Sequence, residues 1–199
     1  MKAIDIVLVP DDAMTEVVIE ANRGLLVDGA GEIVLGREER VPHITVAMGC
    51  VDGERISVIG EKVVDVWESF GGSWVSHLQS AGVTAVINRS GEKVSSFVVL
   101  KSRELQRFHE AIMCGISDEV SYDVGAEMLV DDRVSVPTLE WIRHFSEYSG
   151  FERYMPHITI GYGEVSEVYG LMEYSALKLG LYRLGNHCTC RDLLWEQEI

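Results

Sequence analysis

The sequence predicts an α+β fold with antiparallel sheets, and three observations lead to this fold class. Strand-like runs rich in β-branched residues mix with segments whose apolar residues recur at helical spacing, without the βαβ rhythm of a parallel sheet. The turn-rich tetrapeptide at 88–91 joins two strand-like runs as a hairpin, which makes these neighbours antiparallel. A pentapeptide pattern, Pro-His-Ile-Thr followed by Val or Ile, occurs at 42–46 and again at 156–160, which indicates two related halves.

The first half of the chain is predicted to contain both strands and helices. Asp11 or Asp12 can cap a helix, so we expect one directly after the first strand-like run. In order, the elements are a strand at 3–9, a helix that the Gly-Ala-Gly sequence at 29–31 ends, a short strand at 32–36, the first repeat strand from 42 to about 48, and a helix at 56–70 that two glycines end.

The second half is predicted to begin with the hairpin and to end in strands. Ser102 can cap a helix whose apolar face includes Leu105 and Ile112, so His109, beside that face, is expected to be a packing or boundary residue. In order, the elements are strands at 74–87 and 92–100, this helix, an acidic loop at 117–137, a helix at 137–150, the second repeat strand, a short helix at 166–174, a strand at 177–181, a turn at 185–186 and a strand at 188–196.

Each repeat has the features of a strand that carries reactive side chains on one face. Proline fits the first strand position, where no ladder donor is needed. Because side chains two residues apart share a face, His43 and Thr45 point one way while Ile44 points the other, and His157 and Thr159 share a face in the same manner. The pattern predicts one half of an acid/base site, made twice. A purely structural role for both histidines is the alternative.

The two His-x-Thr motifs, at 43–45 and 157–159, resemble the signature of the two-histidine phosphoesterase superfamily. This superfamily includes the bacterial and archaeal 2′-5′ RNA ligase-like proteins and the cyclic nucleotide phosphodiesterases. The segment 184–186, Leu-Gly-Asn, and the pair Cys190-Arg191 are also similar to members of the group. The resemblance covers the whole chain. It implies a single domain over 1–199, with two pseudo-symmetric lobes, helices flanking the antiparallel sheets, and an active-site cleft between the lobes.

The motif residues supply the groups that phosphodiester hydrolysis needs. A neutral imidazole can deprotonate water while a protonated one donates to the leaving oxygen, so we expect His43 and His157 to act as base and acid, in an order the sequence leaves open. Thr45 and Thr159 can donate hydrogen bonds to non-bridging phosphate oxygens. This chemistry requires no metal, and the sequence predicts no cofactor.

The family resemblance and the strain of a small ring both favour a cyclic phosphodiester as substrate, either a 2′,3′-cyclic nucleotide or the 2′,3′-cyclic phosphate end of an RNA. Candidate contacts to base or phosphate are Tyr162, Arg40, Arg153 and Arg191. Two alternatives stay open: a protein that binds a nucleotide or RNA end without turnover, and an RNA 2′-5′ ligase-like end-processing activity.

Charge and composition restrict the partners. The net charge of −15 repels phosphate backbones, which argues against long duplex nucleic acid but not against a small phosphate ester. The sequence contains no run of about 18 apolar residues and starts without an apolar signal region, so we expect no membrane span and a cytoplasmic location. The oligomeric state is left open.

The four cysteines are expected to be reduced, because they form no C-x-x-C pair and are too few for a disulfide framework. Cys188 and Cys190 alternate along a predicted strand and offer at most two ligands on one face, fewer than a structural zinc site needs. The sequence therefore predicts no metal site.

Overall fold

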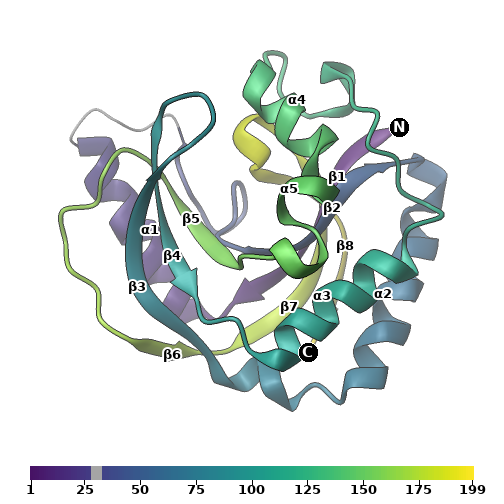
Figure 1. Cartoon of the computed structure of the whole chain (residues 1–199), viewed down its shortest axis with the longest axis horizontal. Helices are drawn as coiled ribbons and strands as arrows, with labels where there is room; N and C mark the ends of the chain where they lie inside the picture. The colour runs from purple at the N-terminus through teal and green to yellow at the C-terminus, as the bar shows by residue number, and fades with distance from the viewer. Residues whose placement is uncertain (28–32) are drawn as a thin grey trace.

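The computed structural model describes residues 1–27 and 33–199 of the chain, which form two lobes, each built on a four-stranded antiparallel sheet (Figure 1). The first sheet has the order β2-β1-β7-β8 and consists of β1 (Lys2–Pro10), β2 (Ile44–Val51), β7 (Ala176–Leu184) and β8 (Cys190–Glu198). The second sheet has the order β5-β4-β3-β6 and consists of β3 (Leu78–Ile87), β4 (Lys93–Val99), β5 (His157–Tyr162) and β6 (Met172–Tyr174). The predicted α+β class with antiparallel sheets and two lobes is confirmed.

The helices flank the sheets and connect the lobes. Helix α1 (Asp12–Val27) starts where Asp11 Oδ1 accepts a hydrogen bond from Met14 N at 2.8 Å, and it packs against β5 of the second sheet. Helices α2 (Ile56–Phe70) and α3 (Arg103–Gly115) pack against each other and lie over β8 and β2 of the first sheet (Figure 1). The strand order also shows that the first sheet is built from the two ends of the chain and the second sheet from its middle.

The remaining helical elements are short. In the described part of the chain they are α4 (Val136–Arg143), α5 (Phe145–Ser149) and the 3₁₀ turns η1 (Gly53–Arg55), η2 (Ser73–His77), η3 (Ala126–Met128), η4 (Phe151–Arg153) and η5 (Asn186–Cys188). Among the described residues, no helix is long and apolar enough to cross a membrane.

One large hydrophobic core runs through both lobes, and a second, smaller cluster matters for the site. The large core includes the buried side chains of Phe97 and Phe108. The small cluster contains Val7, Val41 and Cys190 and lies apart from it. Val7 pairs with Thr45 in the β1–β2 ladder, so the small cluster and the first His-x-Thr motif share one face of the first sheet.

Several predicted boundaries are wrong, for identifiable physical reasons. Residues 74–77 belong to η2 and not to a strand, because Trp74 turns into an aromatic cluster with Trp67 and Phe108. The predicted helix at 166–174 is absent, since 172–174 pairs with β3 as the edge strand β6. The predicted helix at 137–150 breaks at His144 into α4 and α5.

The predicted strand at 32–36 is also wrong for its described part, because 33–36 form no strand. The predicted helix end at Gly29, Ala30 and Gly31 lies outside the described residues.

Candidate functional site

The first His-x-Thr motif lies at the start of β2, and a β-bulge follows it directly. Thr45 pairs with Val7 of β1, and the next ladder pair is Ala47 with Ile6, so Val46 is an extra residue on β2. Because of the bulge, the backbone carbonyl of Val46 lies outside the regular ladder and can accept a hydrogen bond from another part of the chain.

The second motif has the same irregularity at the equivalent position. Thr159 pairs with Ser96 of β4, and the next pair is Gly161 with Ser95, so Ile160 is the extra residue on β5. Beyond the bulge, Tyr162 pairs with Val94, which lies on the same face of β4 as Ser96. The bulge thus shifts the strand phase by one residue, and the side chain of Tyr162 shares a face with that of Thr159. Both motifs are therefore held by the same backbone device, although they lie in different sheets.

The two imidazoles are also anchored in the same way. Nδ1 of His43 is 2.6 Å from the carbonyl oxygen of Val41, and Nδ1 of His157 is 2.9 Å from that of Met155. A carbonyl oxygen only accepts, so each Nδ1 carries the proton and donates it to the residue two positions earlier. In the neutral ring, Nε2 is then the unprotonated nitrogen, available to accept a proton.

The surroundings of the two rings differ. The side chain of His43 is only 15% exposed, whereas His157 is exposed. Burial and, to a smaller extent, the charge of nearby His157 together lower the pKa of His43 to about 4, against the opposing effect of the Val41 carbonyl. Strands β2 and β5 are in contact, so these two motifs, distant in sequence, belong to one region of the molecule.

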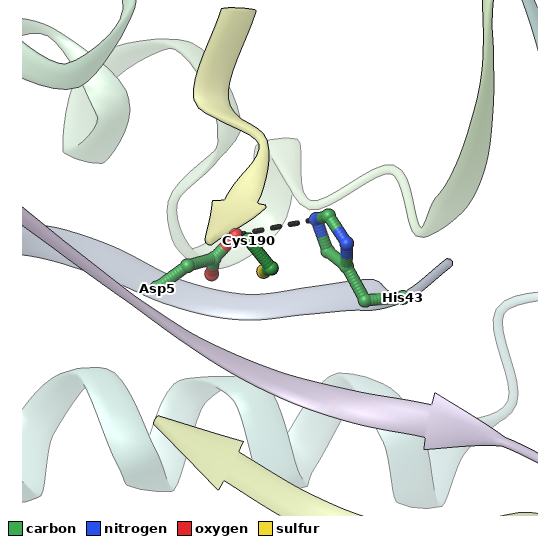
Figure 2. A group of neighbouring side chains, drawn as sticks. All are labelled: Asp5, His43 and Cys190. Carbon is green, nitrogen blue, oxygen red and sulfur yellow. Dashed lines mark ion pairs between the residues drawn. The ribbon is translucent and has the colours of Figure 1, made fainter. Parts of the chain in front are cut away.

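Asp5 of β1 lies beside the first motif and is completely buried. Its Oδ2 accepts a hydrogen bond from Thr45 Oγ1 at 2.7 Å and lies 3.5 Å from Nε2 of His43 (Figure 2). Its Oδ1 is buried without a hydrogen-bond partner among the described residues. Burial raises the pKa of Asp5 well above its usual value, and the Thr45 hydrogen bond offsets only part of this effect. A carboxyl group in this position therefore keeps its proton to a higher pH than an exposed one.

Cys190, the first residue of β8, completes a group of three side chains. One ligand atom each from Asp5, His43 and Cys190 lies within 4.8 Å of the others (Figure 2). Cys190 is fully buried, and burial, together with nearby Asp5, raises the pKa of its thiol well above the usual value. Just before Cys190, the backbone of His187 and Cys188 adopts φ angles of 59° and 54°, in the left-handed region that non-glycine residues rarely occupy.

A buried network connects both motifs to α3. His109 donates from Nδ1 to the bulged carbonyl of Val46 at 2.6 Å and accepts at Nε2 from Phe151 N at 2.8 Å. Its ring stacks on Tyr154 with centroids 4.0 Å apart, and the Tyr154 hydroxyl donates to the Thr45 carbonyl at 2.9 Å. The expectation that His109 is a packing residue is therefore confirmed, and the structure adds that it bonds the first motif to the segment before the second.

The predicted substrate-binding residues lie in two places. A cavity of about 380 Å³ is lined by Ile33, Arg40, Asp131, Asp132, Arg133, Asn186, His187 and Thr189. Tyr162 borders this group, because its hydroxyl is 2.7 Å from Nδ1 of His187. Arg191 pairs with Asp131 at 2.5 Å and with Glu39 at 3.6 Å.

Arg153 lies elsewhere, on η4, where its guanidinium bonds the Glu147 carbonyl of α5. The histidines of the two motifs are not among the residues that line the cavity, but Arg40 is three residues before His43 and Thr189 directly precedes Cys190. Two residues that line the cavity are thus close in sequence to His43 and Cys190.

Sequence reasoning missed Asp5 and Cys190 as members of the site. A signal existed for Asp5, because it interrupts an otherwise apolar strand whose residues are buried, and charged residues are almost never fully buried without a reason. Cys190 was noted only in the pair Cys190-Arg191 and beside Cys188, because its contact with Asp5 depends on the placement of β8 in the first sheet.

The fold and the paired motifs define a two-lobed α+β protein with one His-x-Thr strand in each sheet. Among solved structures, the chain is similar to TT0787 of Thermus thermophilus, with a TM-score of 0.55 and 14% identity over 98% of this chain and 97% of that one. This likeness shows a shared fold. No protein-family model and no curated protein sequence matches the chain.

Proposed function

We propose that the protein is a two-histidine phosphoesterase that hydrolyses a cyclic phosphodiester without a metal. One observation carries the proposal. His43 directly precedes β2 and His157 begins β5, and these two strands are in contact. Each histidine is followed by a threonine and a bulge, and each is anchored through Nδ1 so that Nε2 faces away from the anchoring carbonyl. Two histidines with independent structural roles have no reason to share this set of features.

In the proposed reaction His43 is the general base and His157 the general acid. Nε2 of neutral His43 takes a proton from water, whose oxygen attacks phosphorus. The bond from phosphorus to one ribose oxygen breaks, and His157 donates a proton to that oxygen, which leaves a phosphomonoester. The assignment follows from the environment of His43, because its burial lowers its pKa and a neutral ring suits the base, which leaves the exposed His157 as the acid.

Asp5 supports Thr45 in this scheme. Thr45 has one hydroxyl proton, and a charged Asp5 would hold it in the 2.7 Å hydrogen bond. When Asp5 is protonated, the carboxyl group can donate to Thr45 instead, which frees the hydroxyl proton for a phosphate oxygen. The raised pKa of Asp5 favours this arrangement and avoids a negative charge beside the phosphate.

The charge and the neighbouring cavity favour a small substrate. A net charge of −15 opposes long polyanions, and a volume of about 380 Å³ is at the small-ligand end of protein pockets. Arg40 and Tyr162 lie at or beside this cavity and are proposed to contact the base or ribose, as is Arg191 if substrate displaces one of its two acidic partners. A 2′,3′-cyclic nucleotide or the cyclic phosphate end of an RNA meets these requirements.

The test is a substrate panel in the presence of EDTA. The wild-type protein is incubated with 2′,3′- and 3′,5′-cyclic nucleotides and with RNA that ends in a 2′,3′-cyclic phosphate, and the products are identified by chromatography. We expect ring opening to one phosphomonoester, lost in His43→Ala and His157→Ala. Tight binding of these ligands without any product would favour the binding alternative, and joined RNA ends would favour the ligase alternative.

A further inference from the structure

We propose that Asp5, His43 and Cys190 form a binding site for a zinc-type divalent cation, and that the bound cation switches off hydrolysis by occupying His43. The inhibition rests on the function proposed above, whereas the binding site does not. This site departs from the sequence expectation of no metal, which considered only Cys188 and Cys190.

The three donor atoms lie at separations close to those of metal ligands. They come from β1, the residue before β2, and the first residue of β8, and they lie within 4.8 Å of one another. Two ligands at tetrahedral zinc, each about 2.0–2.1 Å from the metal, are about 3.3 Å apart. The 3.5 Å distance between Asp5 Oδ2 and His43 Nε2 is already close to this value. Three protein ligands leave the fourth position for water.

The outer hydrogen bonds of a metal site are also present. A histidine that ligates a metal through one nitrogen almost always donates its other N–H to a carbonyl or carboxylate. His43 does so, from Nδ1 to the carbonyl of Val41 at 2.6 Å. A ligating carboxylate is usually hydrogen-bonded as well, and Asp5 accepts from Thr45. Nε2 of His43 and the carboxylate of Asp5 are thereby oriented toward the same point (Figure 2).

The carboxyl group of Asp5 lacks a full set of partners. It is 0% exposed, and its Oδ1 has no hydrogen-bond partner among the described residues. An isolated buried carboxylate is costly, and a buried polar atom normally has a partner. A divalent cation bound by the Asp5 carboxylate, the Cys190 thiolate and a neutral His43 gives a site with no net charge. The cation would replace two protons, so binding adds no uncompensated charge to the buried region.

The ligand types select the metal. One oxygen, one nitrogen and one sulfur donor suit zinc, whereas magnesium and calcium prefer oxygen alone. The segment before Cys190 is strained, because His187 and Cys188 adopt left-handed backbone angles. Such angles cost free energy, persist where the surrounding structure enforces them, and are frequent at functional sites.

The consequence for catalysis follows from one lone pair. Nε2 of neutral His43 can either coordinate a metal or accept a proton from water, and it cannot do both. A bound cation also holds Asp5 ionised, so the Thr45 hydroxyl keeps donating its hydrogen bond to the carboxylate and is not available to a phosphate oxygen. Zinc binding should therefore inhibit hydrolysis, and a chelator should restore it.

The binding site is tested on the full chain after removal of metal with EDTA and buffer exchange. Zn²⁺ is titrated in competition with a chromophoric chelator, and Co²⁺ is added separately to look for thiolate-to-cobalt charge-transfer absorption. We expect one Zn²⁺ per chain and the cobalt band in the wild type, with at least a tenfold loss of Zn²⁺ affinity in Asp5→Asn and Cys190→Ala. Cys114→Ser, which changes an exposed thiol on α3, is the matched control and should bind like the wild type.

The outcomes separate binding from inhibition. Wild-type protein that gives no cobalt band, or that binds Zn²⁺ no more tightly than Cys190→Ala, overturns the site, and the wild-type spectrum decides this even if a variant fails to fold. Equimolar Zn²⁺ that leaves hydrolysis unchanged, or that accelerates it, overturns the inhibition while the site stands. Absence of hydrolysis in EDTA together with 1:1 binding refutes the proposed function and not the site.

Discussion

The two His-x-Thr motifs show how one backbone arrangement can be placed in two different environments. In both, the ring donates from Nδ1 to the carbonyl two residues earlier, and a bulge follows the threonine. The neighbours differ: His43 lies against a fully buried carboxyl group and a buried thiol, whereas His157 is exposed. The two rings share the geometry of their anchoring, and the buried surroundings of His43 lower its proton affinity.

The ladder registers locate the difference. Asp5 pairs with Met48, three residues after Thr45, and the equivalent pair in the second sheet is Val94 with Tyr162. The position that is an acid in the first sheet is thus an aliphatic residue in the second. An acid at both positions would have given the two histidines similar surroundings. The difference between the two sites therefore comes from Asp5, which is present only in the first sheet.

The largest expected effect tests whether the two rings act as one unit. His43→Ala and His157→Ala should each lower kcat/KM by about 10²–10⁴-fold, because each removes one positioned proton transfer. The double variant should lose little more than the worse single variant, since acid and base serve the same step. Steady-state kinetics in EDTA measure this.

The control is His77→Ala, because the side chain of His77 is 75% exposed and pairs with Glu173 at the molecular surface. Near-normal turnover in His157→Ala would mean that the exposed ring takes no part, and the acid would have to be sought elsewhere.

Features that depend on nearby residues could be predicted from the sequence, whereas features that depend on contacts between distant segments could not. The motifs, their strand phase and the fold class depend on local periodicity, and these predictions match the observed strands. The bulges and the pairing of Asp5 with the first motif depend on ladder register between distant segments, which periodicity does not encode. The same reason explains the wrong helix at 166–174, where pairing with β3 overrides local preference.

The next effect compares the threonines. Thr45→Val and Thr159→Val each delete a hydroxyl at nearly constant shape, and loss of one transition-state hydrogen bond should lower kcat by about 10–10³-fold. Only Thr45→Val should also cost stability, about 1–3 kcal/mol, because it leaves buried Asp5 without its hydrogen-bond donor. Among the described residues, Thr159 has no side-chain hydrogen bond to lose.

Kinetics and urea unfolding of the two variants, side by side, check both parts. Equal stabilities would contradict a structural role for the Asp5–Thr45 contact, and unchanged kcat in both variants would remove the threonines from the mechanism.

The pH profile sharpens the assignment of base and acid. A base works only in its neutral form, so kcat/KM should rise with pH through the pKa of the base and fall when the acid loses its proton. Burial and the charge of His157 lower the pKa of His43 to about 4, which moves the acid limb down from the usual value near 6.5.

At about pH 5 an ordinary imidazole base would have lost about 30-fold in rate, whereas here the loss should be less than about twofold. The limbs belong to the coupled pair and not to single residues. The measurement is kcat/KM in EDTA from about pH 4 to 9, with circular dichroism to confirm folding at the acid end. An acid limb at about pH 6–7 would show that the base is not the buried ring.

The smallest effect concerns His109, which bonds the bulge of the first motif to the segment before the second. Burial lowers its pKa, while the Val46 carbonyl opposes this, so the folded protein releases the His109 proton at a lower pH than the unfolded chain. Below about pH 6.5 the unfolded state binds more protons at this site, and the free energy of unfolding falls as pH falls, by at most about 1.4 kcal/mol per unit.

His109→Gln removes the titrating group and should flatten this part of the profile, at the expense of about 1–3 kcal/mol at neutral pH for an imperfectly replaced hydrogen bond. His43, whose pKa is also lowered, contributes a slope of the same sign, and Asp5, whose pKa is raised, contributes the opposite sign. Both are present in the wild type and the variant, so the difference between the two urea-unfolding profiles, from about pH 5 to 8, isolates His109. Parallel profiles would mean that His109 takes up its proton at the same pH in the folded and unfolded chains, which would contradict the lowered pKa of His109.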